Sequence, residues 1–393
     1  MTALKLRPEI EELGGNLIRD ISLFGRRFEN TIPLWFGEAD SDTSPEIVAA
    51  AVDALTAGLV RYQPNQGYSP LVSALSEYMT RLYRPIDQDR ILVTVGGMNA
   101  LVLCTQAVVP SGGKVVTIGP YWPNLTAIAR IGGAKVEYSN LIFNGRDWVL
   151  DLDHLLSLID ASTDALLINS PANPTGWVAT EAELSAIAEH CRRTKTWIIS
   201  DEVYGRFYYD KADRAPSLLD VASDDDRLLV VNSFSKSWKM TGWRVGWITL
   251  PPGLLSKFCQ LNEYNVAGPT AFAQAGALEA LREESNLVQF VNDCRSSRDL
   301  VTERLNAIPG VSCANADGAF YAFFRISGAT DSVKLAQDLI QRAGVGLAPG
   351  AAFGPAGEGW LRLCYAQKAA RVSDALDRLE HFLKHPDVPR ETV

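Results

Sequence analysis

The sequence has no long apolar run and no excess of positive charge. No apolar stretch reaches the roughly 18 residues that a membrane-spanning helix needs, and Met1 to Pro8 lacks the apolar core of a signal peptide. The chain has 37 basic and 46 acidic side chains, a net charge of −9, whereas a nucleic-acid-binding surface needs a basic excess. We therefore expect a cytoplasmic protein with no membrane and no nucleic-acid partner.

Patterns typical of disulfides and metal sites are also missing. The six cysteines are scattered without C-x-x-C spacing, which indicates reduced, buried thiols. Of the four histidines, only His381 and His385 stand four residues apart, as on one helix face, and no third ligand lies near them in the sequence. We expect no metal site.

What the sequence does contain is a regular alternation of apolar segments. Its 393 residues are 47 per cent apolar, as in an average globular protein, and are numerous enough for two domains. Between residues 90 and 250, short β-branched runs alternate with longer amphipathic stretches, which predicts βα units around a mostly parallel sheet. The predicted strands are 91–95, 114–118, 165–169, 196–200, 228–232 and 243–249.

Helices are predicted between these strands and in the last third of the chain. Thr180 and Glu183 form a capping-box pattern for a helix over 180–193, and Ser44-Pro45 begins a helix that Gly58 could close. After residue 280 the pattern favours a smaller α+β domain, joined by a helix-borne hinge near residue 280. Its predicted helices are 285–308, 331–343 and 369–383, and its strands are 319–325 and 360–365.

Polar residues follow several of the predicted strands, where open α/β sheets bind ligands. Gly96-Gly97-Met98 opens a helix, which suits a phosphate or simply a tight turn. Asn173 lies between two prolines, which present it rigidly or form an ordinary turn. Asp201 ends a buried strand, where a carboxylate requires a cation unless it caps a helix.

The most informative strand end carries a lysine. Lys236 follows the strand 228–232 directly, in Ser233-Phe-Ser-Lys236, and Gly242-Trp-Arg244 comes soon after. These serines and aromatic residues suit a partly desolvated lysine for Schiff-base chemistry, although most lysines are simply solvated. Lys239 is the competing candidate, and Lys236 is favoured because it comes first after the strand.

In this order along the chain, the residues resemble the class I/II family of pyridoxal-phosphate-dependent aminotransferases, in the branch with bacterial aspartate aminotransferases. The resemblance runs from Gly37-Glu38-Ala39-Asp40 to Arg362-Leu-Cys-Tyr-Ala366. It implies a fold-type-I α/β protein, with a mostly parallel seven-stranded sheet between helices and a smaller α+β domain. The implied parts are an N-terminal arm and part of the small domain in 1–44, the large cofactor-binding domain in 45–280 and the small domain in 281–393.

The resemblance also implies residue roles in binding pyridoxal 5′-phosphate. Lys236 matches the lysine that forms the Schiff base, and Asp201 the partner that keeps the ring nitrogen protonated so that the ring withdraws electrons. Asn173 and Tyr204 match the residues that hydrogen-bond the 3-oxygen, with Tyr204 counted among the catalytic residues, and Trp122 matches the aromatic side chain on the ring. The remaining cofactor contacts are implied for Gly97, Met98, Ser233, Arg244 and, from a second subunit, Tyr62.

The implied substrate contacts and assembly complete this set. Arg362, with the Gly37 backbone, Trp122 and Asn173, matches the residues around the substrate, and arginine suits a carboxylate because it pairs through two hydrogen bonds. Without the resemblance, the sequence is also consistent with Arg362 as a solvent-exposed arginine on an edge strand. The role implied for Tyr62 requires a homodimer.

The chain departs from the family pattern at the mouth of the site. Ala39 replaces a proline, and Pro123-Asn124-Leu125 follows Trp122 where relatives carry Trp-Val-x-Tyr. Met98 stands where aspartate-specific relatives place a lysine for the distal carboxylate. Because a buried carboxylate without a cation is costly, we expect an L-amino donor with an uncharged side chain and an acceptor such as 2-oxoglutarate or pyruvate.

Alternatives to this interpretation remain at this stage. Arg26, Arg27 or another N-terminal arginine could supply the missing cation, as in an aspartate aminotransferase proper. A lyase, racemase or cyclase can use the same fold. A regulatory protein that senses the cofactor would need a DNA-binding module, for which the residues before Gly37 are too few and the net charge of −9 is unfavourable.

Overall fold

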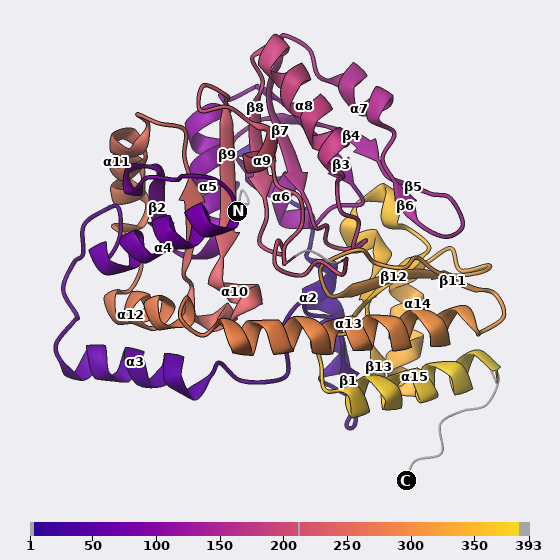
Figure 1. Ribbon diagram of the computed structural model, residues 1–393. Coiled ribbons are helices and arrows are strands. Elements are labelled where there is room, and N and C mark those ends of the chain that lie inside the picture. Colours follow the sequence, from indigo (N-terminus) through magenta and orange to yellow (C-terminus); the bar gives the residue numbers. More distant parts are fainter. Residues whose placement is uncertain (1–3, 211–212, 385–393) are drawn as a thin grey trace.

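The computed structural model describes residues 4–210 and 213–384, and its architecture is built on two β-sheets (Figure 1). His385 lies outside the described residues. The larger sheet has seven strands in the order β2-β10-β9-β8-β7-β3-β4. Only β10 runs antiparallel to its neighbours, so the predicted α/β class and mostly parallel seven-stranded sheet are confirmed. The strands are β2 (Ile91–Thr94), β3 (Lys114–Gly119), β4 (Lys135–Asn140), β7 (Thr163–Asn169), β8 (Trp197–Asp201), β9 (Leu228–Ser233) and β10 (Gly246–Thr249).

Apolar side chains cover both faces of this sheet. Leu92 and Leu229 belong to one buried cluster, and their strand neighbours Val93 and Val230 belong to the other, which explains the continuous apolar runs in the sequence. The surrounding helices are α3 (Pro45–Thr56), α4 (Ser69–Leu82), α5 (Gly96–Val108), α6 (Pro123–Ile131), α7 (Leu152–Leu158), α8 (Glu181–Thr194), α9 (Leu218–Val221), α10 (Phe234–Ser237), α11 (Leu255–Val266) and α12 (Ala271–Ala280). A small hairpin of β5 (Ile142–Phe143) and β6 (Trp148–Val149) projects beside them.

Two of the predicted local signals appear as expected. The capping box of α8 forms, with the Thr180 hydroxyl accepting the Glu183 N–H and the Glu183 carboxylate accepting the Thr180 N–H. Helix α3 begins at Pro45, directly after Ser44, and Gly58 adopts a φ of +85° just beyond its end. No helix in the described part of the chain has the length and apolar character needed to cross a membrane.

The last third of the chain forms a second layer around a four-stranded antiparallel sheet, β11-β12-β15-β14. It contains α13 (Glu284–Asn306), α14 (Ser332–Asp338), a π-helical turn (Leu339–Ala343) and α15 (Ala369–Lys384), close to the predicted helices. The strands are β11 (Val311–Cys313), β12 (Tyr321–Ile326), β13 (Val345–Gly346), β14 (Ala348–Pro349) and β15 (Trp360–Cys364).

The N-terminal segment lies against this second layer. After the short α1 (Pro8–Glu11), helix α2 (Leu17–Gly25) packs on α14 and β14, and β1 (Ile32–Pro33) pairs in parallel with β13. Between α12 and α13 the helical path is interrupted for three residues, 281–283. These contacts support our proposal that residues 1–44 belong partly to the small domain and that the large domain spans 45–280.

Candidate active site

A cavity of about 560 Å³ lies beyond the carboxyl ends of β7, β8 and β9, between the two layers. Of the residues that the sequence analysis singled out for the cofactor and substrate, all but Tyr62 line it: Gly37, Gly97, Met98, Trp122, Asn173, Asp201, Tyr204, Ser233, Lys236, Arg244 and Arg362. Tyr62 is 92 per cent exposed and lies outside the cavity of its own chain. The fold therefore brings together residues that are far apart in the sequence.

Lys236 lies in α10, one turn after β9 ends. Its Nζ donates a hydrogen bond to the Gly37 carbonyl at 2.6 Å, and desolvation in the cavity lowers its pKa to about 8. Lys239 lies elsewhere, since its Nζ is 3.2 Å from the Ser41 hydroxyl and it lines a different groove. An amine with a lowered pKa is a better nucleophile and base near neutral pH, so the geometry favours Lys236.

Asp201, the last residue of β8, is a buried carboxylate without a cation. Its side chain accepts the Val203 N–H at 3.3 Å, and within the described ranges no Lys or Arg forms an ion pair with it. Burial raises its pKa to about 7. No helix begins here, because residues 203–206 form turns, so the helix-cap alternative does not hold. The carboxylate faces a cavity where a cation would stabilise it.

Arg362 is buried, not at a wet strand edge. It lies on β15, and its exposed fraction is 2 per cent. Its Nη1 donates to the Asn173 side-chain oxygen at 2.8 Å, and its Nη2 donates to the Trp35 carbonyl. Its Nε has no hydrogen-bond partner among the described residues. A buried guanidinium that touches only neutral acceptors and has a free N–H is suited to bind a carboxylate.

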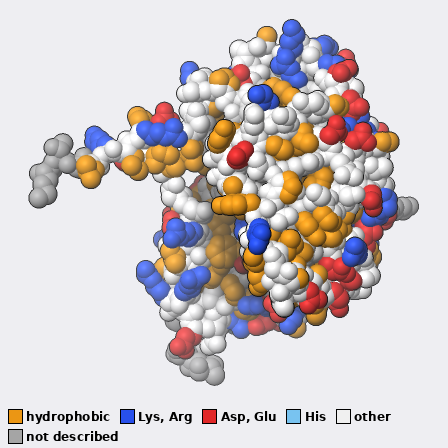
Figure 2. All heavy atoms as spheres, turned by 90° about the vertical axis from the view of Figure 1, so that its left-hand side faces the viewer, with side chains coloured by type: hydrophobic (Ala, Val, Ile, Leu, Met, Phe, Trp, Pro, Cys, Tyr) orange, Lys and Arg blue, Asp and Glu red, His pale blue; other side chains and the backbone are white. Residues whose placement is uncertain are grey.

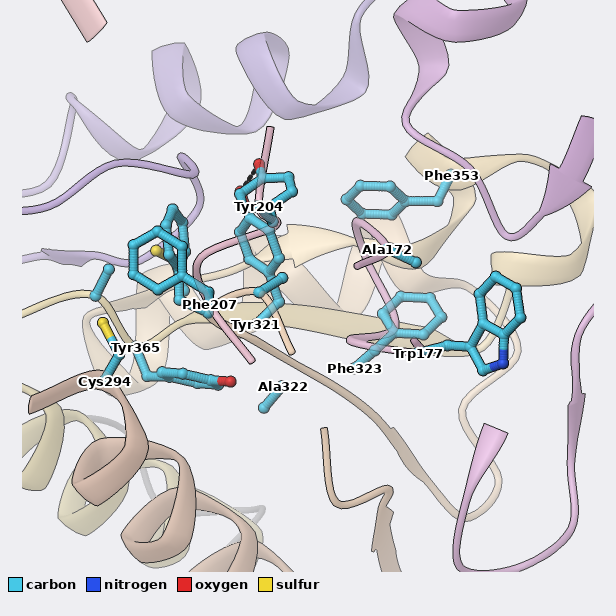
Figure 3. Packing of buried hydrophobic residues seen from close by; sticks show 14 of the residues in the cluster. Ala172, Trp177, Tyr204, Phe207, Cys294, Tyr321, Ala322, Phe323, Phe353 and Tyr365 are labelled. Atoms are coloured by element: carbon cyan, nitrogen blue, oxygen red, sulfur yellow. Dashed lines mark hydrogen bonds between the residues drawn. The ribbon is translucent and has the colours of Figure 1, made fainter. Parts of the chain in front are cut away.

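Two tyrosines connect the cofactor and substrate sides of the cavity. The hydroxyls of Tyr204 and Tyr321 are 2.6 Å apart, as the dashed line in Figure 3 shows. The Tyr321 ring also lies 4.5 Å from the Arg362 guanidinium. A Cβ at Gly37 would collide with the Tyr321 hydroxyl, which explains the glycine there. Tyr321 was not predicted as a site residue, because in the sequence it is only one aromatic residue of a predicted strand.

One corner of the cavity gathers donors suited to an anion. Gly97 lies in the first turn of α5, a helix of 13 residues. Ser233 and Ser235 share a hydrogen bond of 2.9 Å, and Arg244 Nη1 lies 3.4 Å from the Ser235 hydroxyl. Among the described residues, Arg244 forms no ion pair. Hydroxyls, helix N–H groups and an unpaired guanidinium together form a typical phosphate-binding corner.

Part of the cavity lining is apolar. Met98, Leu101, Ile18 and Phe36 line it, and the Asn124 side-chain amide donates to the Met98 sulfur at 3.6 Å. The N-terminal arginine that lines the cavity is Arg19. Of the two arginines named from the sequence, Arg26 lines a neighbouring groove and Arg27 stacks over Phe24.

Comparisons with known proteins agree with this geometry. Residues 29–379 match the family model described as aminotransferase class I and II. A probable aspartate/prephenate aminotransferase from Aquifex aeolicus is 35% identical over 88% of this chain and 90% of its own length. An aromatic-amino-acid aminotransferase from Thermococcus litoralis is 33% identical over 97% of this chain and 99% of its own.

Solved structures show the same architecture. The crystal structure of aspartate aminotransferase from Thermotoga maritima superposes with a TM-score of 0.90 at 30% identity, covering 96% of this chain and 100% of that one. With the matching family model and with relatives that cover almost its whole length, the chain belongs to the class I and II aminotransferases and is an enzyme that transfers amino groups.

Proposed function

We propose that the enzyme binds pyridoxal 5′-phosphate at Lys236, acts as a homodimer and transfers the amino group of an L-amino acid with an uncharged side chain to a 2-oxo acid. The observation that carries this proposal is that a buried carboxylate without an ion pair, Asp201, and a lysine of lowered pKa, Lys236, line one cavity. A buried carboxylate without an ion pair and a buried lysine are both unusual in a protein interior unless a ligand binds to them.

The residues fit the cofactor at each of its polar groups. Asp201 would pair with the ring nitrogen, and the corner of Ser233, Ser235 and Arg244 would hold the phosphate. Trp122, which lines the same cavity, would stack on the ring. When bound, the cofactor withdraws electrons from the substrate Cα and so acidifies its proton.

The side chains of the enzyme then bind the substrate and move its proton. Arg362 binds the α-carboxylate through its Nε, which has no other partner, and through one of its Nη atoms. Its hydrogen bond to Asn173 fixes its orientation. The amine of Lys236, with a pKa of about 8, can take up the Cα proton and return it. Tyr321, packed on Arg362, excludes water from this side.

An exposed apolar face supports the homodimer. On α3, Val48, Val52 and Leu55 are 40, 53 and 47 per cent exposed, beside a groove of about 880 Å³ that Arg244 also lines. The exposed Tyr62 follows α3 closely in the chain. Figure 2 shows apolar side chains gathered on this side of the molecule. Apolar patches of this kind on a water-soluble surface are typical of subunit interfaces.

The apolar wall supports an uncharged donor. Met98 and Leu101 would contact the substrate side chain, and a flexible thioether suits apolar or aromatic groups. Relatives named for aspartate/prephenate and for aromatic amino acids share this fold, so the family name alone does not choose between acidic and apolar donors.

The test compares kcat/KM for phenylalanine, leucine, methionine and tryptophan with that for aspartate, using one acceptor. We expect the best of these donors to exceed aspartate by about tenfold or more, because Met98 and Leu101 favour an apolar side chain over a carboxylate that must give up its water. Met98→Lys should then raise kcat/KM for aspartate, and Met98→Leu should not. A clear preference of the wild type for aspartate would contradict the proposal.

A lyase, racemase or cyclase on this fold would behave differently in a half-reaction. With donor alone, the proposed enzyme converts its bound cofactor stoichiometrically to the pyridoxamine form and releases one 2-oxo acid per site. A reaction that leaves the cofactor spectrum unchanged after each turnover would indicate one of the other chemistries.

A further inference from the structure

Glu202 is a buried acid that the proposed function does not use. It is 4 per cent exposed and follows Asp201 directly in the chain. Unlike Asp201, it does not line the cavity, and within residues 4–210 and 213–384 it forms no ion pair. A buried carboxylate is costly unless hydrogen bonds stabilise it, so the partners of Glu202 indicate what it holds in place.

The carboxylate of Glu202 accepts hydrogen bonds from two separate elements. Its Oε1 accepts the Ser200 hydroxyl of β8 at 2.8 Å and the Leu218 N–H of α9 at 3.3 Å. Its Oε2 accepts the hydroxyl of Ser217, the cap residue of α9, at 2.7 Å. These bonds tie the beginning of α9 to the end of β8.

The chain between these two tied points carries Tyr204. It leaves β8 after Glu202, and its described residues, 203–210 and 213–216, lead to α9. Tyr204 is 3 per cent exposed, and the centre of its ring lies 5.8 Å from the Lys236 amine. A change at the base of this segment would therefore be felt in the cavity.

Backbone hydrogen bonds connect the position of Tyr204 to both ends of the segment. The Glu202 N–H donates to the Val231 carbonyl of β9 at 2.9 Å, and the Glu202 carbonyl accepts the Gly205 N–H at 2.9 Å. The Gly205 carbonyl accepts the Ala215 N–H at 2.8 Å. Because Tyr204 lies between Glu202 and Gly205, a shift at either end would move its hydroxyl, and a hydrogen bond to a ligand tolerates little movement.

We propose that Glu202 is a positioning residue for the cofactor site: by tying the beginning of α9 to the end of β8, it holds the Tyr204 hydroxyl where it donates to the 3-oxygen of the cofactor. The inference rests on the proposed function and deepens it, because it assigns the placement of Tyr204 to a residue outside the cavity. A hydroxyl that donates to this oxygen stabilises its anionic form and so lowers the pH at which the bound cofactor loses its proton.

The test is a double-mutant cycle, measured by the visible absorption of the holoenzyme against pH. Tyr204→Phe removes the hydroxyl and should raise the midpoint by about one pH unit, and Glu202→Gln should raise it by about half a unit. In the Tyr204→Phe background, Glu202→Gln should cause no further shift, because its effect passes through Tyr204. Ser217→Ala removes one donor and should behave like Glu202→Gln. Unshifted midpoints in both Glu202→Gln and Ser217→Ala, or shifts that add in the double variant, would overturn the inference.

Glu183→Gln is the matched control. Its carboxylate also accepts hydrogen bonds at a helix cap, at 2.7 and 2.8 Å, but it lies on α8 and lines no part of the cavity. The control should leave the midpoint unchanged. In the cofactor-free protein, Glu202→Gln should speed hydrogen exchange of the Gly205 amide about fivefold, and unchanged exchange would also contradict the role of Glu202.

Tyr204→Phe separates this inference from the proposed function. A wild-type midpoint in Tyr204→Phe would refute the proposed contact of Tyr204 with the cofactor. A raised midpoint in that variant, with none in Glu202→Gln, would refute only the role of Glu202.

Discussion

Among single residues, two adjacent buried acids at the end of β8, Asp201 and Glu202, differ in their hydrogen bonds, and Asp201 lines the cavity. Asp201 accepts a single backbone N–H, whereas Glu202 accepts from the Ser200 and Ser217 hydroxyls and the Leu218 N–H. Burial raises the pKa of each carboxyl to about 7. Asp201 is therefore poorly stabilised by the protein alone, as expected of a group that awaits a cationic ligand.

The two acids share a raised pKa, so the difference in hydrogen bonds predicts a larger stability gain when Asp201 is neutralised than when Glu202 is. The Asp201 pKa is raised from 3.8 to about 7, so its carboxylate destabilises the folded state fully above pH 7 and progressively less as the pH falls from 7 towards 4. Asp201→Asn should raise the Tm of the cofactor-free protein by a few degrees at pH 8 and by less at pH 5, while transamination is largely lost. Thermal unfolding at the two pH values measures this.

Glu202→Gln is the matched control for that measurement. Burial raises the Glu202 pKa as well, so Glu202→Gln also removes a desolvated charge. Because the replacement leaves unmade some of the hydrogen bonds from three donors, it should raise Tm at pH 8 by less than Asp201→Asn does. A fall in Tm for Asp201→Asn at pH 8 would show that the protein itself neutralises this carboxylate.

The polar residues at the strand ends could be predicted from the sequence, but the residues that hold them in position could not. Lys236, Asp201 and Asn173 were foreseeable because they follow apolar strands in an α/β pattern. Tyr321 and the Trp35 carbonyl were not, since each acts through contacts with residues distant in the chain. These strand-end residues converge on one cavity, which supports the proposed cofactor site.

At the scale of elements, α8 offers a local test of how the sequence determines structure. Its capping box links Thr180 and Glu183 through reciprocal hydrogen bonds. Thr180→Ala should destabilise the protein by about 1 kcal/mol without changing KM, because α8 lines no part of the cavity. Denaturant unfolding measures the loss, and Glu181→Gln, in the same turn but outside the box, is the control. Equal effects of the two changes would contradict the capping account.

Where predicted and observed elements differ, local chemistry explains the difference. The strand predicted over 243–249 begins at Gly246, because residues Thr241–Trp243 form a 3₁₀ turn and Arg244 takes a left-handed conformation with φ of 56°. Strand β4 was not identified from its pattern, because it is a polar edge strand with half of its residues exposed. Buried central strands give a clear apolar signal and edge strands do not.

At the scale of the whole molecule, the proposed dimer accounts for the exposed face of α3. Sedimentation should give a mass twice the 42.9 kDa of one chain. Val52→Asp places a charge on this face and should shift the protein towards monomers, with activity lost on dilution. Val149→Asp, a similarly exposed valine on the β5–β6 hairpin, should leave the dimer intact. A fully active wild-type monomer would contradict the proposal.

Lys236 is the residue that we propose carries the cofactor. The most direct measurement treats the holoenzyme with borohydride, which reduces a Schiff base to a stable secondary amine, and locates the phosphopyridoxyl group by peptide mass spectrometry. We expect one label per chain, on Lys236, and no label in Lys236→Ala, in which transamination should fall by several orders of magnitude. A label on Lys239, or none on either lysine while activity persists, would contradict it.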